Sequence, residues 1–247
     1  MSAAARIPGK TGTGGGRQME RKNTRRKPGN RRLRWMIGGV GAVVALALII
    51  FLVQRYTPSN ERMALTDYFV LTEENQAAVI VNGTYYEDET ETPVHGIYQD
   101  GHPYLEISFL KEHLDDGYVY DGTENVLRYI TSSNVISVSP GSNAYMVDRS
   151  RQQMDHNIMI AREGAVYLSL DFVKQYTDLT YSVAEDPSRV TIEKAGYEKT
   201  TAALKRDTEL RRHGGVKSPI LKDGKEGDVV SILEDYGSWS LVLTDDG

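Results

Sequence analysis

Pro103-Tyr-Leu-Glu-Ile-Ser-Phe-Leu-Lys111 recurs, with small changes, as Val166-Tyr-Leu-Ser-Leu-Asp-Phe-Val-Lys174. Tyr, Leu, Phe and Lys return at the same places, 63 residues later, and Tyr118 and Tyr181 keep that spacing. An internal repeat indicates two similar structural units, and each of these is too small to bury its apolar face alone. We therefore expect the two copies to pack together as one domain over residues 76–196.

Each copy of the repeat reads as a short strand, a short helix and a two-stranded hairpin. Ser108 and Asp171 are the expected N-caps of the two helices, because their side chains can accept hydrogen bonds from the first turn. Upstream, the apolar run 77–81 predicts a strand that Asn82-Gly83 turns into a hairpin. The aromatic residues at matched places in the two copies are expected to fill the core; they are Tyr104, Phe109, Tyr167 and Phe172.

Residues 206–247 show a different rhythm, with short apolar runs divided by Gly-containing turns. Such spacing is typical of a small β-barrel. Residues 197–205 are expected to form a connector between this barrel and the repeat domain.

The stretch from Trp35 to Val53 has nineteen residues and no charge. At about 1.5 Å per residue, a helix of this length spans the hydrocarbon core of a bilayer. We expect a transmembrane helix over 35–53, followed by a polar stalk over 54–75. A cleaved signal peptide is a poorer interpretation, because both the apolar run and the segment before it are too long.

Charge is divided unevenly about this segment. Residues 1–34 hold eleven Lys or Arg and one Glu, for a net charge of +10, whereas the remaining 18 basic and 33 acidic residues give −15. Basic flanks are retained in the cytoplasm, so we expect residues 1–34 inside and the rest outside the cell. The absence of Cys fits an exported protein without disulfides and excludes thiolate metal sites and Cys nucleophiles.

The basic segment 1–34 lacks apolar periodicity, and we expect it to be a disordered cytoplasmic tail. Arg31, Arg32 and Arg34, next to the apolar run, are predicted to contact anionic lipid headgroups, unless the tail is a topology signal only. Nothing in the tail is specific for nucleic acid, which is not an expected partner. Gly38 and Ala42 form a small-x-x-x-small pattern, which raises the hypothesis of a helix-mediated dimer.

Two modules resemble known families. The repeated Tyr-Leu-x-(Ile/Leu)-x-Phe-(Leu/Val)-Lys pattern of residues 76–196 resembles the copper amine oxidase N-terminal-like domain, whose likeness implies a non-catalytic interaction module and no copper site. The run from Leu210 through Ser218-Pro219-Ile220-Leu221 and Gly227-Asp228 to Trp239 and Asp246-Gly247 is similar to a bacterial SH3 (SH3b) domain. That family continues into a further closing strand, so we expect a truncated module here. The predicted fold is thus mainly β with short helices, an α+β repeat domain plus a small SH3-like barrel, preceded by one transmembrane helix.

This order of anchor, repeat domain and SH3b module resembles the N-terminal part of membrane-anchored family 18 glycosidases of Firmicutes, especially anaerobic Clostridia. In that architecture a TIM-barrel hydrolase follows, and its Asp-x-x-Asp-x-Asp-x-Glu motif does not occur in this sequence. The resemblance implies that this chain corresponds to the part before the catalytic barrel. Whether Gly247 is the biological terminus, and whether a catalytic domain follows it, stays open at this point.

Candidate chemistry is sparse along the chain. The histidines are scattered, with no metal-binding spacing, although His95 and His102 would meet across a hairpin. Gly9-Lys10-Thr11 lacks the earlier Gly of a phosphate loop, and no cofactor is expected. The carboxylates that would be needed for glycan hydrolysis lie beside turns, where Asp is favoured for local reasons; they are Asp115, Asp116, Asp121, Glu124, Glu185 and Asp186. We therefore expect neither a catalytic nor a metal site.

Aromatic residues with a polar edge are the better binding candidates, because they suit stacking on sugar rings or peptides. We single out Tyr236, Trp239, Tyr118 and Tyr181 for ligand contact. Core packing in the small barrel is an alternative interpretation for Trp239. The expected function is binding or targeting at the outer face of the cell membrane, with cell-wall glycan or peptide as the ligand. An extracellular scaffold that recruits a partner enzyme and a glycan hydrolase in its own right are the alternatives.

Overall fold

The computed structural model describes residues 31–88 and 93–247. The predicted disordered tail over 1–34 therefore lies almost wholly outside the described residues. The chain divides into two compact units, Met1–Tyr56 and Thr57–Gly247, and each is described by itself below.

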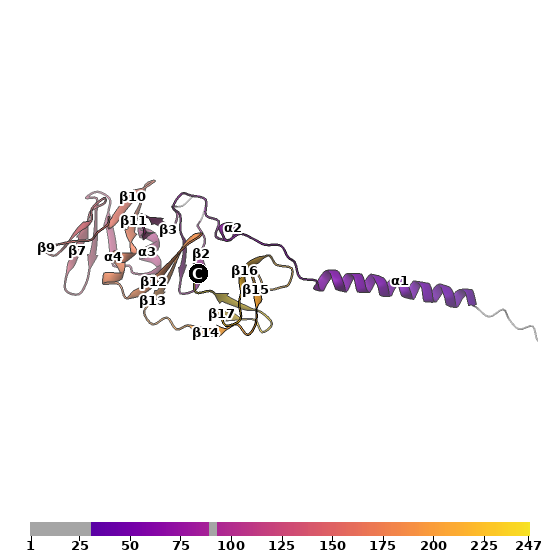
Figure 1. The fold of residues 1–247 in the computed structure, drawn as a ribbon. Helices are drawn as coiled ribbons and strands as arrows, with labels where there is room; N and C mark the ends of the chain where they lie inside the picture. The colour runs from indigo at the N-terminus through magenta and orange to yellow at the C-terminus, as the bar shows by residue number, and fades with distance from the viewer. Residues whose placement is uncertain (1–30, 89–92) are drawn as a thin grey trace, which may run out of the picture. The chain divides into compact units, whose positions relative to one another are not determined.

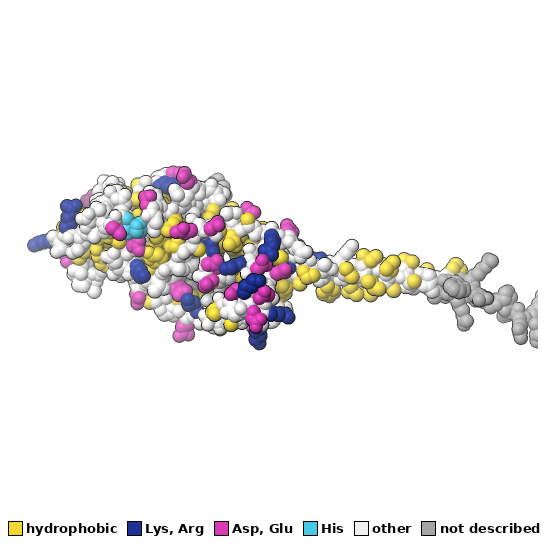
Figure 2. All heavy atoms as spheres, in the orientation of Figure 1, with side chains coloured by type: hydrophobic (Ala, Val, Ile, Leu, Met, Phe, Trp, Pro, Cys, Tyr) yellow, Lys and Arg dark blue, Asp and Glu magenta, His cyan; other side chains and the backbone are white. Residues whose placement is uncertain are grey.

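In the first unit, the described residues form helix α1 (Arg31–Tyr56). Its segment Gly38–Tyr56 is long and apolar enough to cross a membrane, three residues further along than the predicted start. Figure 2 shows hydrophobic side chains along this helix, and those of Val43, Leu48 and Phe51 are exposed. A helix that is apolar on all sides fits a lipid environment. α1 is therefore compatible with a single-pass membrane anchor.

The second unit is mainly β, as predicted, and its described residues, 57–88 and 93–247, form five sheets and three short helices (Figure 1). The helices are α2 (Leu65–Phe69), α3 (Ile107–His113) and α4 (Leu170–Tyr176). One four-stranded sheet has the order β12 (Leu179–Glu185), β13 (Ser188–Lys194), β1 (Ala78–Val81), β2 (Thr84–Tyr86). The other has the order β10 (Met159–Arg162), β11 (Ala165–Ser169), β4 (His102–Glu106), β3 (Gly96–Gln99).

The remaining strands form one larger and two smaller sheets. The five-stranded sheet follows chain order: β5 (Tyr118–Asp121), β6 (Val126–Ile130), β7 (Val135–Val138), β8 (Ala144–Val147) and β9 (Ser150–Gln153). Near the C-terminus, β14 (Thr200–Ala203), β17 (Val229–Asp235) and β18 (Ser240–Leu243) form one sheet, and β15 (Thr208–Arg211) pairs with β16 (Ile220–Gly224). We call these last five strands the C-terminal sheets.

The two copies of the repeat meet strand to strand. β4 and β11 are antiparallel, and Leu105 lies directly opposite its repeat partner Leu168. The flanking strands β3 and β10 also differ by 63 residues, as do the two-residue turns that join them to β4 and β11. The sheet therefore has a local pseudo-twofold axis at the Leu105–Leu168 pair. One strand of each copy thus lies at the centre of a shared sheet, and a single domain over residues 76–196 stays a prediction.

Each copy has the expected order of strand, helix and hairpin, but its helix begins earlier than predicted. The N-caps are Glu106 and Ser169 rather than Ser108 and Asp171. The Glu106 carboxylate accepts a hydrogen bond from the Phe109 backbone N–H at 2.9 Å, so a longer side chain performs the capping. Ser169 makes no such bond.

The main core lies between the sheets and the two repeat helices. Phe109 and Phe172 are 5% and 0% exposed within it, whereas Tyr104 and Tyr167, each 3% exposed, pack on the other side of β4 and β11. All four aromatic residues are thus buried, as predicted. The run before Asn82-Gly83 is buried on every residue, because one face of β1 joins the main core and the other packs against α2.

The segment predicted as a stalk is partly built into the second unit. The backbone N–H of Met63 donates to the carbonyl of Ile220 in β16 at 2.9 Å. Phe69 in α2 is 3% exposed and packs against Ala78 and Ile80 of β1. α2 packs against β1 because the outer face of β1 is apolar, and its burial removes that surface from water.

The C-terminal sheets begin inside the predicted connector 197–205, since β14 pairs with β17. They contact the repeat domain through Leu233, which lies so close to Gly83 that a Cβ there would meet it at 2.4 Å. Arg189 of β13, 2% exposed, donates from Nε to the Asp246 carbonyl at 2.6 Å and pairs through Nη2 with its carboxylate at 3.0 Å. A buried guanidinium with these partners joins the two parts of the unit.

Candidate functional site

Tyr236 and Trp239 flank the turn of the β17–β18 hairpin. The Tyr236 N–H donates to the Trp239 carbonyl at 2.9 Å, which places the two residues opposite each other. Their side chains are 67% and 36% exposed. The indole ring lies against Gly214, where a Cβ would meet Trp239 Cγ at 3.3 Å. The loop therefore supports one side of the indole and leaves the pair of aromatic rings accessible.

Two further residues share this side of the hairpin. Glu234 and Leu241 are cross-strand partners, and side chains two residues apart on a strand point the same way. Glu234, Tyr236, Trp239 and Leu241 thus form one exposed surface, the hairpin face. The Tyr236 hydroxyl donates to the Glu234 carboxylate, and this bond and its negative charge raise the pKa of Tyr236.

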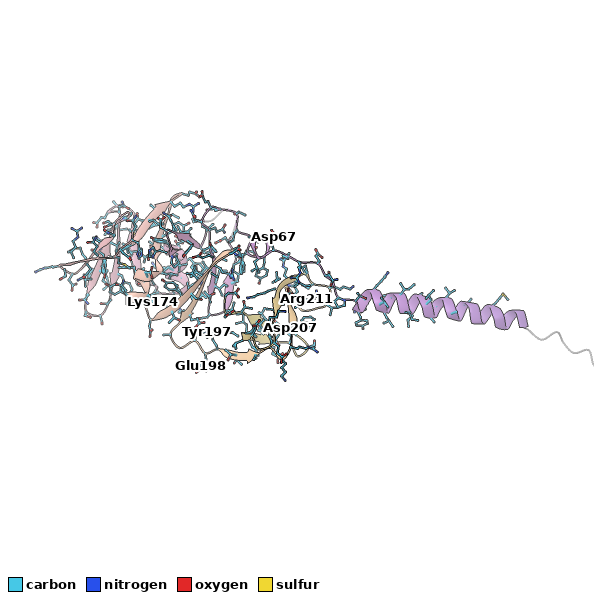
Figure 3. All side chains as sticks on the ribbon, in the orientation of Figure 1. Asp67, Lys174, Tyr197, Glu198, Asp207 and Arg211 are labelled. Atoms are coloured by element: carbon cyan, nitrogen blue, oxygen red, sulfur yellow. The ribbon has the colours of Figure 1, made fainter. Side chains whose placement is uncertain are left out.

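Tyr118 and Tyr181, the other two predicted ligand residues, differ in their exposure to solvent. Tyr118 is 0% exposed and stacks on Tyr129 with ring centroids 4.2 Å apart. Its prediction as a ligand contact is corrected, because β5 turns this ring into the main core rather than to solvent. Tyr181, in the matched place, is partly exposed: its hydroxyl donates to Asp171, and Lys174 Nζ (labelled on α4 in Figure 3) lies 5.6 Å from its ring centroid.

The predicted lipid contacts fall outside what the structure describes. α1 begins at Arg31. The side chains of Arg31, Arg32 and Arg34 are outside the described residues.

A cluster of polar side chains gathers around Tyr181. His102 opens β4, Asp171 lies in the first turn of α4, and His156 precedes β10. The two imidazoles stack with centroids 3.7 Å apart and planes 14° from parallel. His102 Nδ1 donates to Asp171 Oδ2 at 2.8 Å, and His156 Nε2 lies 3.8 Å from the same oxygen. We call His102, His156 and Asp171 the His–Asp cluster.

The surroundings hold His156 in one orientation. Its Nδ1 donates to Asp155 Oδ1 at 2.7 Å, since a carboxylate only accepts, so Nε2 accepts from the Ser169 hydroxyl at 2.8 Å in the neutral ring. The loop that carries His156 is fixed by Tyr104, whose hydroxyl donates to the Asn157 carbonyl at 2.8 Å. Ser169 therefore orients the histidine instead of capping α4.

Ser169, His156 and Asp155 have the connectivity of a hydrolase triad. The nucleophile of such a triad must reach a substrate carbonyl, but Ser169 is 0% exposed. Its hydroxyl is also bracketed by the strand and helix that it joins. This arrangement therefore positions a histidine and does not attack a substrate.

Asp171 is the charged centre of the cluster. Partial burial of the carboxyl raises its pKa, but the hydrogen bonds from Tyr181 and His102 and the charges of the two imidazoles outweigh burial, so the pKa is lowered overall. Burial and the Asp171 hydrogen bond raise the pKa of Tyr181 in turn. The carboxylate is thus held ionised, with both oxygens directed by neighbours.

Neither the spacing of the histidines nor the hairpin hypothesis locates this cluster. His95 and His102 do not pair with each other: His95 Nδ1 contacts Asp88, and His102 contacts Asp171. His102 and Asp171 are 69 residues apart in sequence and come from different copies of the repeat. The residue of the first copy that matches Asp171 is Ser108. The replacement of a hydroxyl by a carboxylate is therefore the only sign of this cluster that comparison of the two copies gives.

The carboxylates considered for glycan hydrolysis have local roles. Asp121 accepts from the backbone N–H groups of Thr123 and Glu124, which lowers its pKa, and Glu124 pairs with Arg128. Asp115 accepts from the Tyr129 hydroxyl at 2.9 Å. Turn closure, ion pairing and a hydrogen bond from a tyrosine therefore account for three of these carboxylates, Asp121, Glu124 and Asp115.

Comparison with known proteins adds one match. Residues 76–193 match the family model described as copper amine oxidase N-terminal domain. This range begins two residues before β1, ends one residue before the end of β13 and contains both copies of the repeat. Searches of the curated proteins and of the solved structures found no match. Residues 76–193 are thus similar to a copper amine oxidase N-terminal domain, a non-catalytic module that is compatible with a binding or targeting role.

Proposed function

We propose that this chain is a membrane-anchored module that binds cell-wall glycan or peptide at the outer face of the cell membrane. α1 is the anchor, with its N-terminus in the cytoplasm, because the eleven basic residues before residue 35 are retained there. The unit Thr57–Gly247 is then extracytoplasmic. In a longer chain of the architecture that the sequence resembles, this unit would deliver a family 18 glycoside hydrolase to the wall.

The hairpin face is the observation that supports cell-wall glycan as the ligand. A sugar ring stacks on exposed aromatic rings through its C–H groups, and its hydroxyls need a nearby acceptor. Tyr236 and Trp239 supply the rings, and the Glu234 carboxylate lies beside them. We assign the C-terminal sheets the role of an SH3b-like binding module, with the repeat domain as its spacer.

The test is sedimentation of the purified unit Thr57–Gly247 with insoluble peptidoglycan. This unit has its own hydrophobic core. We expect the pellet to be enriched over a control protein, and Tyr236→Ala with Trp239→Ala to weaken binding at least tenfold. That loss corresponds to stacking worth about 1–2 kcal/mol.

Ile130→Ala is the matched control, because Ile130 is also an exposed apolar residue, 66% exposed, but lies on β6. It should bind as the unaltered unit does. Absence of enrichment on peptidoglycan, or equal binding by the hairpin variant and the control, would refute the proposal.

One observation favours the alternative of a protein scaffold. Across the described residues, no strand pairs with the outer edge of β9, and all four of its side chains are exposed. An open edge of this kind accepts an extended segment of a partner as an added strand. A cavity of about 540 Å³ beside it is lined by residues that include Tyr145, Asp148 and Arg149. Recovery of one stoichiometric protein with the full chain from membranes would support this function instead.

A further inference from the structure

We propose that His102, His156 and Asp171 bind a divalent transition-metal ion of the zinc class. The ligand atoms of the three side chains all lie within 4.8 Å of one another. Two imidazole nitrogens and one carboxylate oxygen form a donor set that zinc uses where a fourth position is left open. This inference does not depend on the proposed glycan binding.

The distances fit a tetrahedral ion. Ligands about 2 Å from zinc lie about 3.3 Å from one another. The separations from Asp171 Oδ2 are 2.8 Å to His102 Nδ1 and 3.8 Å to His156 Nε2, one on either side of that value. These two separations therefore bring the three ligand atoms close enough to share one ion after the ring rotation described below.

The neighbouring residues have the arrangement expected around a metal site. A ligating histidine commonly donates its other N–H to a carboxylate, which fixes the ring and directs the free nitrogen to the ion. Asp155 does this for His156, and the Tyr181 hydroxyl does the equivalent for the second oxygen of Asp171. Both ligand side chains therefore have a supporting partner.

The pseudo-twofold symmetry supplies an internal comparison. At the matched places in the other copy, His102 is replaced by Ala165 and Asp171 by Ser108. Strand, helix and hairpin form there as well. The fold therefore does not require the His–Asp cluster, and a ligand explains why it is assembled on one side only.

Two changes must accompany binding. The Ser169 hydroxyl, 2.8 Å from His156 Nε2, must release this nitrogen so that it can bind the ion, and one imidazole must change its orientation. A metal ion lies in the plane of an imidazole ring, but the two rings are stacked, so one must rotate out of the stack. His102 has room to do so, because its side chain is 26% exposed whereas that of His156 is 8% exposed. Rotation also breaks the hydrogen bond between His102 and Asp171, and the two side chains then bind the same ion instead. Since His102 belongs to the first copy and Asp171 to the second, the ion ties the two copies together.

The test measures Zn²⁺ binding to the full chain in detergent by equilibrium dialysis and calorimetry. We expect one ion per chain, no displacement by Mg²⁺, and a loss of affinity of at least a hundredfold in His102→Gln, His156→Gln and Asp171→Asn. Asp155→Asn should weaken binding about 10–100-fold, as supporting carboxylates do. The matched control is His213→Gln. His213 is exposed in the loop between β15 and β16, so its substitution should leave the affinity for Zn²⁺ unchanged.

Two measurements keep the result interpretable. Circular dichroism of the metal-free variants shows whether each still folds. In the unaltered chain with ¹⁵N-labelled histidine, Zn²⁺ should shift the side-chain signals of two of the five histidines, and at a hundredfold excess over Kd the Tm should rise by about 5–10 °C. Failure to bind Zn²⁺, or binding that survives all three ligand substitutions, would overturn the proposal.

Discussion

At the scale of single residues, backbone conformation is the feature that the sequence reveals best. Asn82-Gly83 was predicted as a turn, and both residues have positive φ, 49° and 81°. The matched turns Asp100-Gly101 and Glu163-Gly164 adopt the same left-handed pair. Gly tolerates the left-handed region because it has no Cβ, and Asn and Asp tolerate it because their short side chains can hydrogen-bond to the local backbone. The longer Glu side chain does not gain such a bond.

Glu163→Asn should therefore stabilise the unit Thr57–Gly247 by about 0.5–1 kcal/mol, because Glu163 has φ of 53°. Loss of its ion pair with Arg162, at 3.6 Å, should cost little, because the Glu163 side chain is 69% exposed. The measurement is the urea midpoint with the m-value held constant. A midpoint at or below that of the unaltered unit would show that strain at this turn is not relieved.

At the scale of elements, we expect two residues at the pseudo-twofold axis to contribute strongly to the stability of the unit. Leu105 and Leu168 are both 0% exposed and lie opposite each other. Either change to Ala should cost about 2–5 kcal/mol, since each removes buried methyl groups and leaves a cavity. Because the two residues are neighbours, the double variant should deviate from the sum of the single effects. Denaturation of all three variants measures this.

Leu241→Ala is the control for these leucines, because Leu241 is 47% exposed and its change should stay within about 0.5 kcal/mol. If Leu105→Ala were as mild as Leu241→Ala, the pseudo-twofold contact would not be part of the stabilising core.

The elements of the repeat were predictable because their signals are local. Alternating apolar residues, the Asn82-Gly83 turn and a fixed spacing of Tyr, Leu and Phe each act over a few residues. The burial of Tyr118 was not predictable, since its matched residue Tyr181 remains partly exposed. The His–Asp cluster escaped for a related reason: its members come from β4, the loop before β10 and α4, and only the tertiary fold brings them together.

At the scale of the whole second unit, one ion pair links the repeat domain to the C-terminal sheets. Asp246 receives hydrogen bonds from Lys222 and Thr244, both at 2.6 Å, and pairs with the buried Arg189. Burial raises the pKa of Asp246, but these bonds and the charges of Lys222 and Arg189 outweigh burial, so the pKa is lowered overall.

A carboxyl whose pKa is lowered by folding stabilises the protein above its ordinary value of 3.8. That stability is lost as the pH falls through the lower, folded-state value. Asp246→Asn should therefore cost about 1–3 kcal/mol at pH 7 and progressively less as the pH falls below 3.8, because the unaltered protein then loses its own carboxylate beside Arg189. Urea unfolding at pH 7 and at a series of pH values below 3.8 measures the difference.

Asp207→Asn serves as the comparison, since Asp207 (labelled in Figure 3) pairs with Lys225 at 2.9 Å but both side chains are largely exposed. Its effect on stability at pH 7 should be much smaller than that of Asp246→Asn, because exposed ion pairs contribute little. Equal effects of the two substitutions at pH 7, or an Asp246→Asn effect that does not decrease as the pH falls below 3.8, would contradict this account.

The parallel pairing of β1 with β13 has a consequence for how the protein is made. Ala78 lies beside Arg189, so the partner of β1 leaves the ribosome more than a hundred residues later. Until then, the apolar residues of β1 have no neighbour on that edge, and contacts between such distant segments form slowly. The nascent chain must therefore keep its first strand from aggregating while the second copy is synthesised, and a fragment that stops before β13 would be a substrate for chaperones and proteases rather than a smaller version of this domain.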